Sequence, residues 1–284
     1  MVYKQMESSV SKDRYAVVGN PISHSKSPLI HEAFAKQTQQ NMSYERVLAP
    51  LDGFDATVKD LIAQGYKGVN ITVPFKFEAF QLSNELTERA RNAGAVNTLI
   101  FRDKAIIGDN TDGAGLVRDI EQNLHIPIQG KRILLIGAGG AAEGVLQPIL
   151  AGMPATLVVT NRTLDKAMAM ISKLEKHGGS HQTTVSVCAF EDLHGQVFDI
   201  VINATSTGLS DMTLPIPITI FSENCVAYDM MYGKETPFMA QARVAGAQVV
   251  DGLGMLVEQA AEAFYLWRGV RPETKSVMAM VRAL

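Results

Sequence analysis

A glycine-rich segment near the middle of the chain has the residue types and spacing of a site for a dinucleotide pyrophosphate. The spacing Gly137-x-Gly139-x-x-Ala142 follows an apolar run and precedes a helical pattern. A glycine turn between a strand and a helix lets phosphate oxygens approach backbone N–H groups, and the helix N-terminus adds partial positive charge. The pattern therefore predicts a dinucleotide site, although an ordinary strand–helix turn can carry the same glycines.

The next predicted strand, residues 155–160, ends in Asn161-Arg162-Thr163, about where such a unit delivers a side chain to the adenosine ribose. No carboxylate stands there, whereas Arg162 and Lys166 are cationic. Arginine binds phosphate oxygens through two hydrogen bonds, and lysine adds a point charge. The charges favour NADP(H) over NAD(H). The other interpretation is that Thr163 only caps the next helix while both cations are solvated.

Two ionisable residues in the first part of the chain could position and supply a proton. Hydride transfer to a carbonyl needs a group that protonates the developing alkoxide. Lys76 stands in a predicted strand–helix turn and Asp112 in a glycine-bounded turn. A lysine near a carboxylate is held in place and stays available for proton transfer. On sequence alone, a surface charge is the other interpretation of each residue.

Short neutral polar side chains gather in the same region. They are Ser25, Ser27, Asn70, Thr72 and Asn97. Such groups suit a polyhydroxylated ligand, and the same residue types also serve turns and helix caps. A second hydroxylated segment, residues 203–208, follows a predicted strand directly. Open α/β sheets bind ligands beyond such strand ends, although an ordinary polar loop would look the same.

The elements that must position these residues alternate between strand and helix, which predicts an α/β fold with largely parallel sheets. Strands are predicted at residues 15–19, 44–48, 69–73, 94–101, 105–108, 131–136, 155–160, 185–188, 198–203 and 226–229. Helices are predicted to begin at residue 28 and to cover 54–64, 77–82, 85–92 and 254–267, with a turn at 65–68. Asn70 and Thr72 alternate in one strand and so face the same side.

Single residues give further expectations. Ser27 is expected to cap a helix whose first position is Pro28. Pro148 predicts a kink or an early end of the helix after the glycine turn, because it lacks an N–H group. Gly269 closes the last long helix. Gln259 lies on that helix among apolar residues, and the pattern alone places it at the solvent-facing edge.

Length and composition limit the classes of function. A chain of 284 residues is near twice the usual domain size, so two domains are expected. The net charge of −3 supplies no basic field, so no nucleic-acid partner is expected. Cys188 and Cys225 form no disulfide framework or metal spacing, which fits a reducing cytoplasm. Residues 1–14 predict a frayed extension without a signal peptide, and no apolar run reaches the roughly 20 residues of a membrane span.

Nine motifs in order along the chain resemble the shikimate dehydrogenase family. They are Asn20–Pro28, Asn70–Lys76, Gly94–Thr98, Gly108–Gly113, Gly137–Ala142, Asn161–Thr163 with Lys166, Asn203–Gly208, Asp229–Tyr232 and Asp251–Ala260. The resemblance implies reversible reduction of 3-dehydroshikimate to shikimate with NADPH, a step of chorismate and aromatic amino acid biosynthesis. It also implies two α/β domains with a cleft between them. The substrate domain would comprise residues 1–112 plus 251–284, and a Rossmann-type NADP-binding domain residues 113–250.

The resemblance further implies roles for single residues. Lys76 and Asp112 match the family's catalytic pair, with Lys76 as the proton donor in reduction and Asp112 as its orienting partner. The implied substrate contacts are Ser25, Ser27, Asn70, Thr72, Lys76, Asn97, Asp112, Tyr232 and Gln259. The implied cofactor contacts are Gly137, Ala138, Gly139, Gly140, Ala141, Asn161, Arg162, Thr163, Lys166, Thr205, Met230 and Gly252. Gln259 is thereby placed in the cleft, against the solvent-facing expectation, and no metal is implied.

Two alternatives stay open at this stage. Relatives of the family accept quinate, some of them with NAD, but here the serine loop and the Asn70-x-Thr72 strand are unaltered. A different class is a non-catalytic NADP-binding sensor, against which the retention of both Lys76 and Asp112 argues. The sequence therefore favours a cytoplasmic enzyme with a small-molecule substrate, either a monomer or a homodimer.

Overall fold

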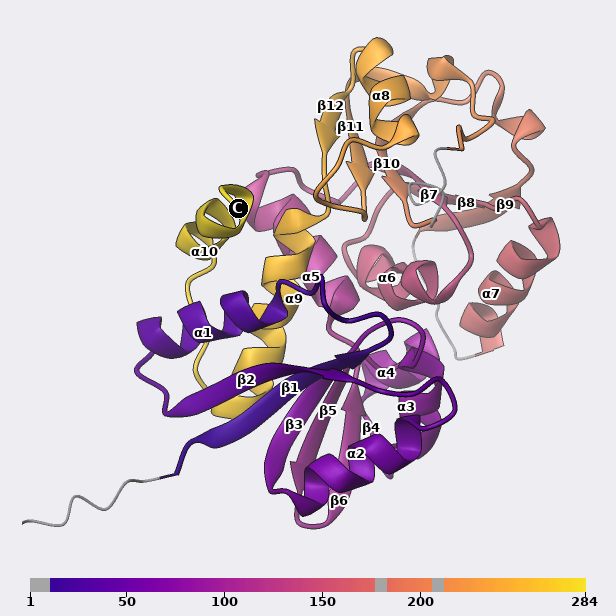
Figure 1. The fold of residues 1–284 in the computed structure, drawn as a ribbon. Helices are drawn as coiled ribbons and strands as arrows, with labels where there is room; N and C mark the ends of the chain where they lie inside the picture. Colours follow the sequence, from indigo (N-terminus) through magenta and orange to yellow (C-terminus); the bar gives the residue numbers. More distant parts are fainter. Residues whose placement is uncertain (1–10, 177–182, 206–211) are drawn as a thin grey trace, which may run out of the picture.

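The computed structural model describes residues 11–176, 183–205 and 212–284. Its strands form two six-stranded sheets, one in each half of the molecule (Figure 1). The first sheet contains β1 (Asp13–Gly19), β2 (Met42–Leu48), β3 (Tyr66–Ile71), β4 (Glu85–Leu86), β5 (Thr98–Arg102) and β6 (Ala105–Asp109). The second contains β7 (Arg132–Ile136), β8 (Thr156–Thr160), β9 (Thr184–Cys188), β10 (Phe198–Asn203), β11 (Phe221–Asp229) and β12 (Gln248–Val250).

Helices surround both sheets. The α-helices are α1 (Ser27–Gln37), α2 (Phe54–Ala63), α3 (Lys76–Leu82), α4 (Glu88–Ala93), α5 (Asp112–Arg118), α6 (Gly140–Ala151), α7 (Leu164–Lys176), α8 (Pro237–Val244), α9 (Leu253–Arg268) and α10 (Lys275–Arg282). A π-helical turn, η1 (Asp119–Asn123), continues α5, and short 3₁₀ turns are η2 (Glu191–Leu193) and η4 (Ile218–Ile220). No helix in the described part of the chain is both long and apolar enough to cross a lipid bilayer.

The second sheet is parallel throughout, in the order β12-β11-β10-β7-β8-β9. This is the strand order of doubly wound dinucleotide-binding sheets, in which the winding direction reverses between the first and fourth strands. Here those strands are β7 and β10. Residues 133–136 are fully buried, as expected for a central parallel strand covered on both faces. The crevice at the carboxyl ends of β7 and β10 is therefore the expected ligand position.

The first sheet has the order β2-β1-β3-β5-β6-β4. β1 runs parallel to β2 and β3, and β4 runs parallel to β6, whereas β5 is antiparallel to both of its neighbours. The predicted pairing of β5 with the strand at residues 105–108 is confirmed. Because β5 reverses direction, the carboxyl ends of β3 and β6 meet the start of β5 at one edge of the sheet. This edge faces the second half of the molecule.

Two further features of the first sheet differ from the prediction. Residues 66–68, expected in a turn, belong to β3; the turn consists of Gln64 and Gly65, and Gly65 has a φ of 85°. A Cβ on Gly68 would lie 2.4 Å from Nε1 of Trp267, so this glycine lets α9 approach the strand. Residues 94–97, expected in a strand, precede β5, because Gly94 ends α4 in the left-handed region. Residues 85–92 are divided between β4 and α4 rather than forming one helix.

Helix ends give two corrections. Ser27 is the first residue of α1 rather than its cap; its N–H donates to Oγ of Ser25 at 3.3 Å, and Pro28 lies in the first turn as predicted. Pro148 does not end α6, which continues to Ala151. The predicted frayed extension is wrong at its end, because β1 begins at Asp13, and residues 1–10 lie outside the described part.

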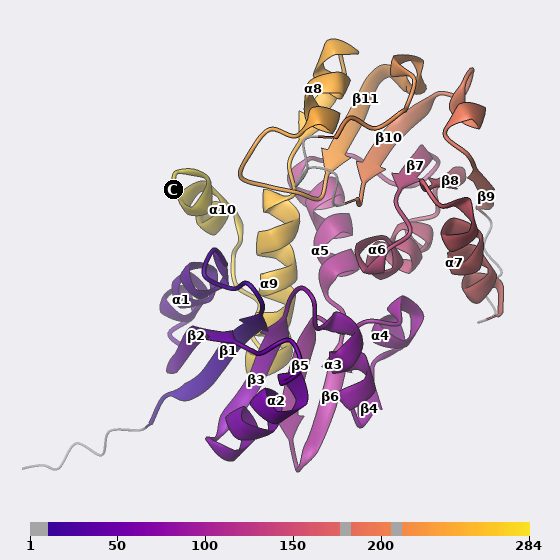
Figure 2. The same ribbon diagram turned by 45° about the vertical axis from the view of Figure 1, so that its right-hand side comes forward.

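Two helices connect the halves. α5 leaves the first sheet, and α9 brings the chain back to it; the two pack side by side (Figure 2). Val257 and Phe264 of α9 join the core on one face of the first sheet, while Met255, at the start of the same helix, joins the core of the second half. α9 therefore spans both cores, and any polar side chain on its inner face lies where the halves meet.

Candidate active site

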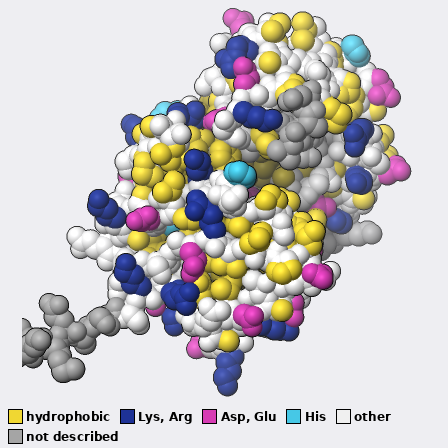
Figure 3. Space-filling view, viewed as in Figure 1, with side chains coloured by type: hydrophobic (Ala, Val, Ile, Leu, Met, Phe, Trp, Pro, Cys, Tyr) yellow, Lys and Arg dark blue, Asp and Glu magenta, His cyan; other side chains and the backbone are white. Residues whose placement is uncertain are grey.

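A cavity of about 490 Å³ lies between the two halves. Figure 3 shows apolar side chains gathered around a hollow on this face of the molecule. The described residues lining the cavity include all the predicted substrate contacts, namely Ser25, Ser27, Asn70, Thr72, Lys76, Asn97, Asp112, Tyr232 and Gln259. Four predicted cofactor contacts also line it: Ala141, Thr205, Met230 and Gly252. The structure thus brings side chains from distant parts of the sequence around one space.

Lys76 and Asp112 form an ion pair in this cavity. Lys76 begins α3 after β3, and Asp112 begins α5 after β6, so both stand at the same edge of the first sheet. Nζ of Lys76 lies 2.5 Å from Oδ2 of Asp112, and the two side chains are 23% and 10% exposed. The interpretation of both residues as isolated surface charges is therefore wrong. The pair presents one ammonium group, held by a carboxylate, to the cavity.

Asn97 fixes the orientation of Asp112. Its Nδ2 donates to Oδ1 of Asp112 at 2.8 Å, while its Oδ1 accepts the N–H of Thr111 at 2.8 Å. The N–H of Asp112 donates in turn to Oδ1 of Asn110. Because each carboxylate oxygen of Asp112 has its own donor, the carboxylate cannot rotate without losing a hydrogen bond. Asn97 reaches this position because it directly precedes β5, the strand between β3 and β6.

Gln259 lies at the cavity rather than at the solvent-facing edge of α9. Its Nε2 donates to the carbonyl oxygen of Leu256 at 2.8 Å, and its Oε1 is 3.4 Å from Nδ2 of Asn97. A Cβ on Gly115 would lie 2.7 Å from the backbone nitrogen of Gln259. Gly115 therefore lets α5 pack closely against α9. That close packing turns this polar side chain inward, which the periodicity of α9 alone could not indicate.

Asn70 accepts a hydrogen bond from a side chain that the sequence analysis did not predict as part of the site. The hydroxyl of Tyr44, on β2, donates to Oδ1 of Asn70 at 2.7 Å. Nδ2 of Asn70 donates to Oγ1 of Thr98 at 3.0 Å. Both ends of the amide are therefore engaged, which fixes its orientation. Tyr44 belongs to an edge strand without any predicted site residue, so the sequence carried no local signal for it.

His31 on α1 supports Tyr44. The two rings stack with centroids 4.1 Å apart and an interplanar angle of 7°. His31 is fully buried, and this desolvation lowers its pKa to about 3, against a smaller raising effect of the nearby Asn70. The imidazole is therefore neutral at pH 7, and it packs behind the site against Tyr44, which in turn holds Asn70.

Replacing this histidine is expected to change how stability depends on pH. The unfolded chain takes up a proton on His31 near pH 6.5, whereas the folded chain does so only near pH 3. The free energy of unfolding therefore keeps its full value above pH 6.5. It decreases as the pH falls from 6.5 toward 3, because only the unfolded chain binds the proton in this range. Between pH 6.5 and 5, wild type should lose about 1.5 kcal/mol more than His31→Phe.

Urea unfolding at several pH values measures this difference. His194→Phe, at an exposed position, is the matched control and should keep the wild-type pH dependence. Equal slopes for wild type and His31→Phe would contradict a neutral buried imidazole.

The glycine turn leaves room for a cofactor's phosphates. Gly137 has a φ of 119°, a region that favours glycine, and a Cβ there would lie 3.2 Å from the backbone of Ala204. A Cβ on Gly139 would meet no described atom within 4 Å. No side chain of the described residues caps the N-terminus of α6 at Gly139, so among these residues its first N–H groups remain available as donors. These features fit the pyrophosphate of a dinucleotide.

The cationic residues lie at the end of β8 and the start of α7, away from the cavity. Nδ2 of Asn161 donates to the carbonyl oxygen of Thr163 at 2.7 Å, which orders the turn. Arg162 and Lys166 are exposed, and neither forms an ion pair with another described residue. Both therefore remain available to a phosphate group.

A buried carboxylate positions the part of the cavity wall nearest the glycine turn. Asp229 ends β11 and accepts hydrogen bonds from Thr236, Asn203 and the N–H of Met231. Burial raises its pKa, although these three donors oppose the rise. Thr205 donates its hydroxyl to Oδ1 of the same Asn203 at 2.7 Å. The rest of the predicted hydroxylated segment, residues 206–208, lies outside the described part.

Met230 and Gly252 approach each other through their backbones. The N–H of Gly252 donates to the carbonyl oxygen of Met231 at 2.9 Å, and a Cβ on Gly252 would lie 2.3 Å from the carbonyl oxygen of Met230. Glycine at this position thus lets the start of α9 close one side of the cavity. Tyr232 follows on the same wall.

Comparison with family models gives three matches along the chain. The shikimate dehydrogenase substrate binding domain matches residues 17–99, the shikimate / quinate 5-dehydrogenase model residues 119–211, and the shikimate 5′-dehydrogenase C-terminal domain residues 252–282. The chain belongs to the shikimate dehydrogenase family. Its two-sheet α/β architecture, predicted from the sequence, is confirmed as the architecture of that family.

Individual proteins are similar to this chain over nearly its whole length. A shikimate dehydrogenase (NADP(+)) from Methylobacillus flagellatus is 61% identical, covering 95% of this chain and 99% of its own. An Ael1 enzyme from Pseudomonas putida is 46% identical with a TM-score of 0.88, covering 95% and 98%. Shikimate 5-dehydrogenase from Thermus thermophilus, in complex with NADP(H) and shikimate, is 30% identical with a TM-score of 0.84, covering 95% and 99%.

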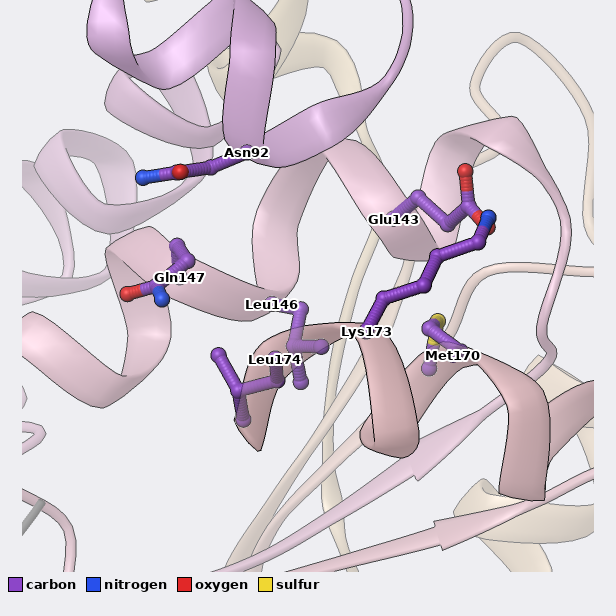
Figure 4. A pocket seen from close by; sticks show the side chains of 7 residues that line it. All are labelled: Asn92, Glu143, Leu146, Gln147, Met170, Lys173 and Leu174. Carbon is purple, nitrogen blue, oxygen red and sulfur yellow. The ribbon is translucent and has the colours of Figure 1, made fainter. Parts of the chain in front are cut away.

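Other hollows and clusters do not add to this family site. A small pocket between α4, α6 and α7 has a volume of about 20 Å³, about enough for one water molecule (Figure 4). It is lined by Asn92, Glu143, Leu146, Gln147, Met170, Lys173 and Leu174. Within the described ranges, no group of three or more His, Cys, Asp or Glu side chains could hold a metal ion.

Proposed function

We propose that the chain is an NADP-dependent shikimate dehydrogenase, which reversibly reduces 3-dehydroshikimate to shikimate in aromatic amino acid biosynthesis. The observation that carries the proposal is the Lys76–Asp112 ion pair, set among neutral amides and hydroxyls and next to the glycine turn. Proteins of the family that are similar to this chain are named shikimate dehydrogenases (NADP(+)). Their names support shikimate as the substrate and NADP(H) as the cofactor. A sensor that only binds NADP would need no such proton-transfer pair.

The proposed reaction assigns the proton to Lys76. NADPH, when bound, supplies the hydride to the carbonyl carbon. The π electrons of the C=O bond move to its oxygen, and Nζ of Lys76 gives that oxygen a proton, forming the hydroxyl. Asp112 holds the ammonium group 2.5 Å away and accepts a hydrogen bond from a substrate hydroxyl. Oxidation of shikimate runs through the same groups in reverse.

The other site residues divide between the ends of the substrate and the cofactor. We assign the substrate carboxylate to Ser25 and Ser27. The hydroxyls and ring edge are assigned to Asn70, Thr72, Asn97 and Gln259. Tyr232 is assigned to the substrate side of the cavity. The pyrophosphate is assigned to the segment Gly137–Ala141 and the 2′-phosphate region to Asn161, Arg162, Thr163 and Lys166. The nicotinamide side is assigned to Met230 and Gly252, and Thr205 is a further cofactor contact.

Three features of the whole protein remain predictions. The domain boundaries are residues 1–112 plus 251–284 for the substrate domain and 113–250 for the cofactor domain. Within these boundaries the proposed catalytic pair and its amide partners belong to one domain and the glycine turn to the other. The protein is proposed to act in the cytoplasm, as a monomer or a homodimer.

Quinate is the substrate that most needs to be distinguished from shikimate. One of the matching family models covers shikimate / quinate 5-dehydrogenases. Quinate carries an additional hydroxyl on the carbon that bears the carboxylate, so discrimination falls to the side chains near Ser25 and Ser27. Both serines line the cavity of this chain, and we therefore propose shikimate as the preferred substrate.

Absorbance of the reduced nicotinamide tests the proposal. Purified protein is mixed with shikimate or quinate, each with NADP⁺ or NAD⁺. Reduction should be at least about tenfold faster with shikimate and NADP⁺ than in the other combinations. NAD⁺ lacks the 2′-phosphate, and the additional hydroxyl of quinate has to be accommodated beside the serines, each at a cost of about 1.4 kcal/mol or more. Equal rates with quinate would contradict the substrate choice. If the folded protein binds NADPH but produces no reduced nicotinamide in any combination, the hypothesis of a non-catalytic NADP-binding sensor would be favoured.

A further inference from the structure

The proposed carboxylate end of the cavity is formed by two neutral serines, with His24 before them and Lys26 between them in the chain. The described residues that line the cavity include one lysine and no arginine. That lysine, Lys76, is paired with Asp112, so its charge is already balanced. Ser25 and Ser27 are neutral donors. A carboxylate moved from water into such a site loses hydration that two hydroxyl groups replace only in part.

An arginine stands directly behind the serine loop. Arg46 lies on β2, and its Nε and Nη2 both donate to the carbonyl oxygen of Ser25, at 3.0 and 2.6 Å. Arg46 forms no ion pair with another described residue, so no carboxylate cancels its charge. The guanidinium therefore combines a two-bond contact to the loop with an unbalanced positive charge beside it.

This contact fixes the direction of the Ser25 hydroxyl. The carbonyl of Ser25 is turned toward Arg46, and Oγ of Ser25 accepts the N–H of Ser27 at 3.3 Å. Since Oγ is engaged as an acceptor, the hydroxyl proton is left to donate to a ligand. With the backbone and the acceptor side both held, little conformational freedom remains to be lost when an anion binds.

The same strand also supports the second part of the substrate site. Tyr44 and Arg46 are two residues apart on β2 and so lie on one face of the sheet. Tyr44 holds Asn70, and Arg46 holds Ser25. A charged residue on an edge strand also discourages pairing with another sheet, but that role does not require a double contact to a loop carbonyl.

We propose that Arg46 is a positioning residue for the substrate's carboxylate: this exposed side chain orients Ser25 through its carbonyl oxygen and adds positive charge beside the serine loop. The proposal rests on the proposed function, because it takes the carboxylate of shikimate as the ligand of the serine loop. It predicts a specific defect when the charge is removed. Binding of the anionic substrate should weaken, whereas proton and hydride transfer at the other end should proceed.

The test compares Arg46→Met with wild type, using shikimate and its uncharged methyl ester. For shikimate, KM should rise about tenfold and kcat should stay within about twofold, which corresponds to losing one charge-assisted interaction. For the methyl ester, KM should change by less than about threefold, because its carbonyl keeps the serine hydrogen bonds but carries no charge. Arg46→Lys, which keeps the charge but not the fork, should give an intermediate KM for shikimate.

Arg14→Met is the matched control. Arg14 lies on the neighbouring strand β1, binds Tyr66 and Glu45, and has no contact with the serine loop. It should leave both KM values unchanged. An unchanged KM of Arg46→Met for shikimate, or an equal rise for shikimate and the ester, would overturn the proposal. A wild-type protein without shikimate turnover would instead overturn the proposed function.

Discussion

Lys76→Ala is expected to lower kcat for shikimate oxidation about a thousandfold, the size of effect typical of a removed general acid or base. Nζ of Lys76 is the ammonium group that Asp112 holds in the cavity, at 2.5 Å. Without it, the substrate oxygen must exchange its proton with water. The affinity for NADPH should stay within about twofold, because the proposed cofactor contacts lie between Gly137 and Gly252 and none of them belongs to α3.

Steady-state rates and a fluorescence titration with NADPH measure the two quantities. Lys67→Ala is the matched control: Lys67 is exposed on β3, so the same change of charge occurs in the same sheet. It should keep both values. A kcat of Lys76→Ala within about tenfold of wild type would remove Lys76 from proton transfer, since an essential general acid contributes more than this.

Arg162→Ala should weaken NADPH binding about thirtyfold and NADH binding less than twofold, because a charge-assisted bidentate contact contributes about 2 kcal/mol. Arg162 is exposed at the end of β8, and no described carboxylate pairs with it, so a phosphate group would be its main partner. The only difference between the two cofactors is the 2′-phosphate. The ratio of the two dissociation constants therefore isolates this contact from effects on the fold.

Arg102→Ala removes the same charge at an exposed position of the β5–β6 hairpin and serves as the control. Isothermal titration with each cofactor gives the dissociation constants. If NADPH and NADH weaken by the same factor in Arg162→Ala, the arginine acts on the turn as a whole, and the assignment of the 2′-phosphate fails.

The cofactor half was largely predictable from the sequence because its signals are local. The glycines stand between a buried strand and a helix, and Gly137 adopts the φ of 119° that makes the residue necessary. Continuous apolar runs such as residues 133–136 indicate a parallel sheet with both faces covered. Of the two outcomes predicted at Pro148, the early end of the helix is wrong: α6 continues past this residue, and the packed helix tolerates the loss of one hydrogen bond.

The candidate site was predictable by family resemblance, but its supports were not. Tyr44 lies on a strand without motif residues, and His31 lies on α1 beyond the motif residues Ser27 and Pro28; they support Asn70 only through the packing of α1 and β2. Gln259 looked solvent-facing because helical periodicity reports the polarity of a face, not which neighbour covers it. The neighbour is α5, which packs closely against α9 because Gly115 has no side chain. Gly115 and Gln259 are far apart in the sequence, so no local pattern contains their contact.

The course of α9 between the halves also determines when each half can be completed during synthesis. Strands β7 to β12 come from one stretch of chain that leaves the ribosome before α9. One face of the first sheet, around Tyr15 and Phe34, stays uncovered until Val257 and Phe264 arrive near the end of translation. The half that is synthesised first is thus the last to complete its fold. Its apolar face stays exposed on the nascent chain for the longest time and needs protection from aggregation.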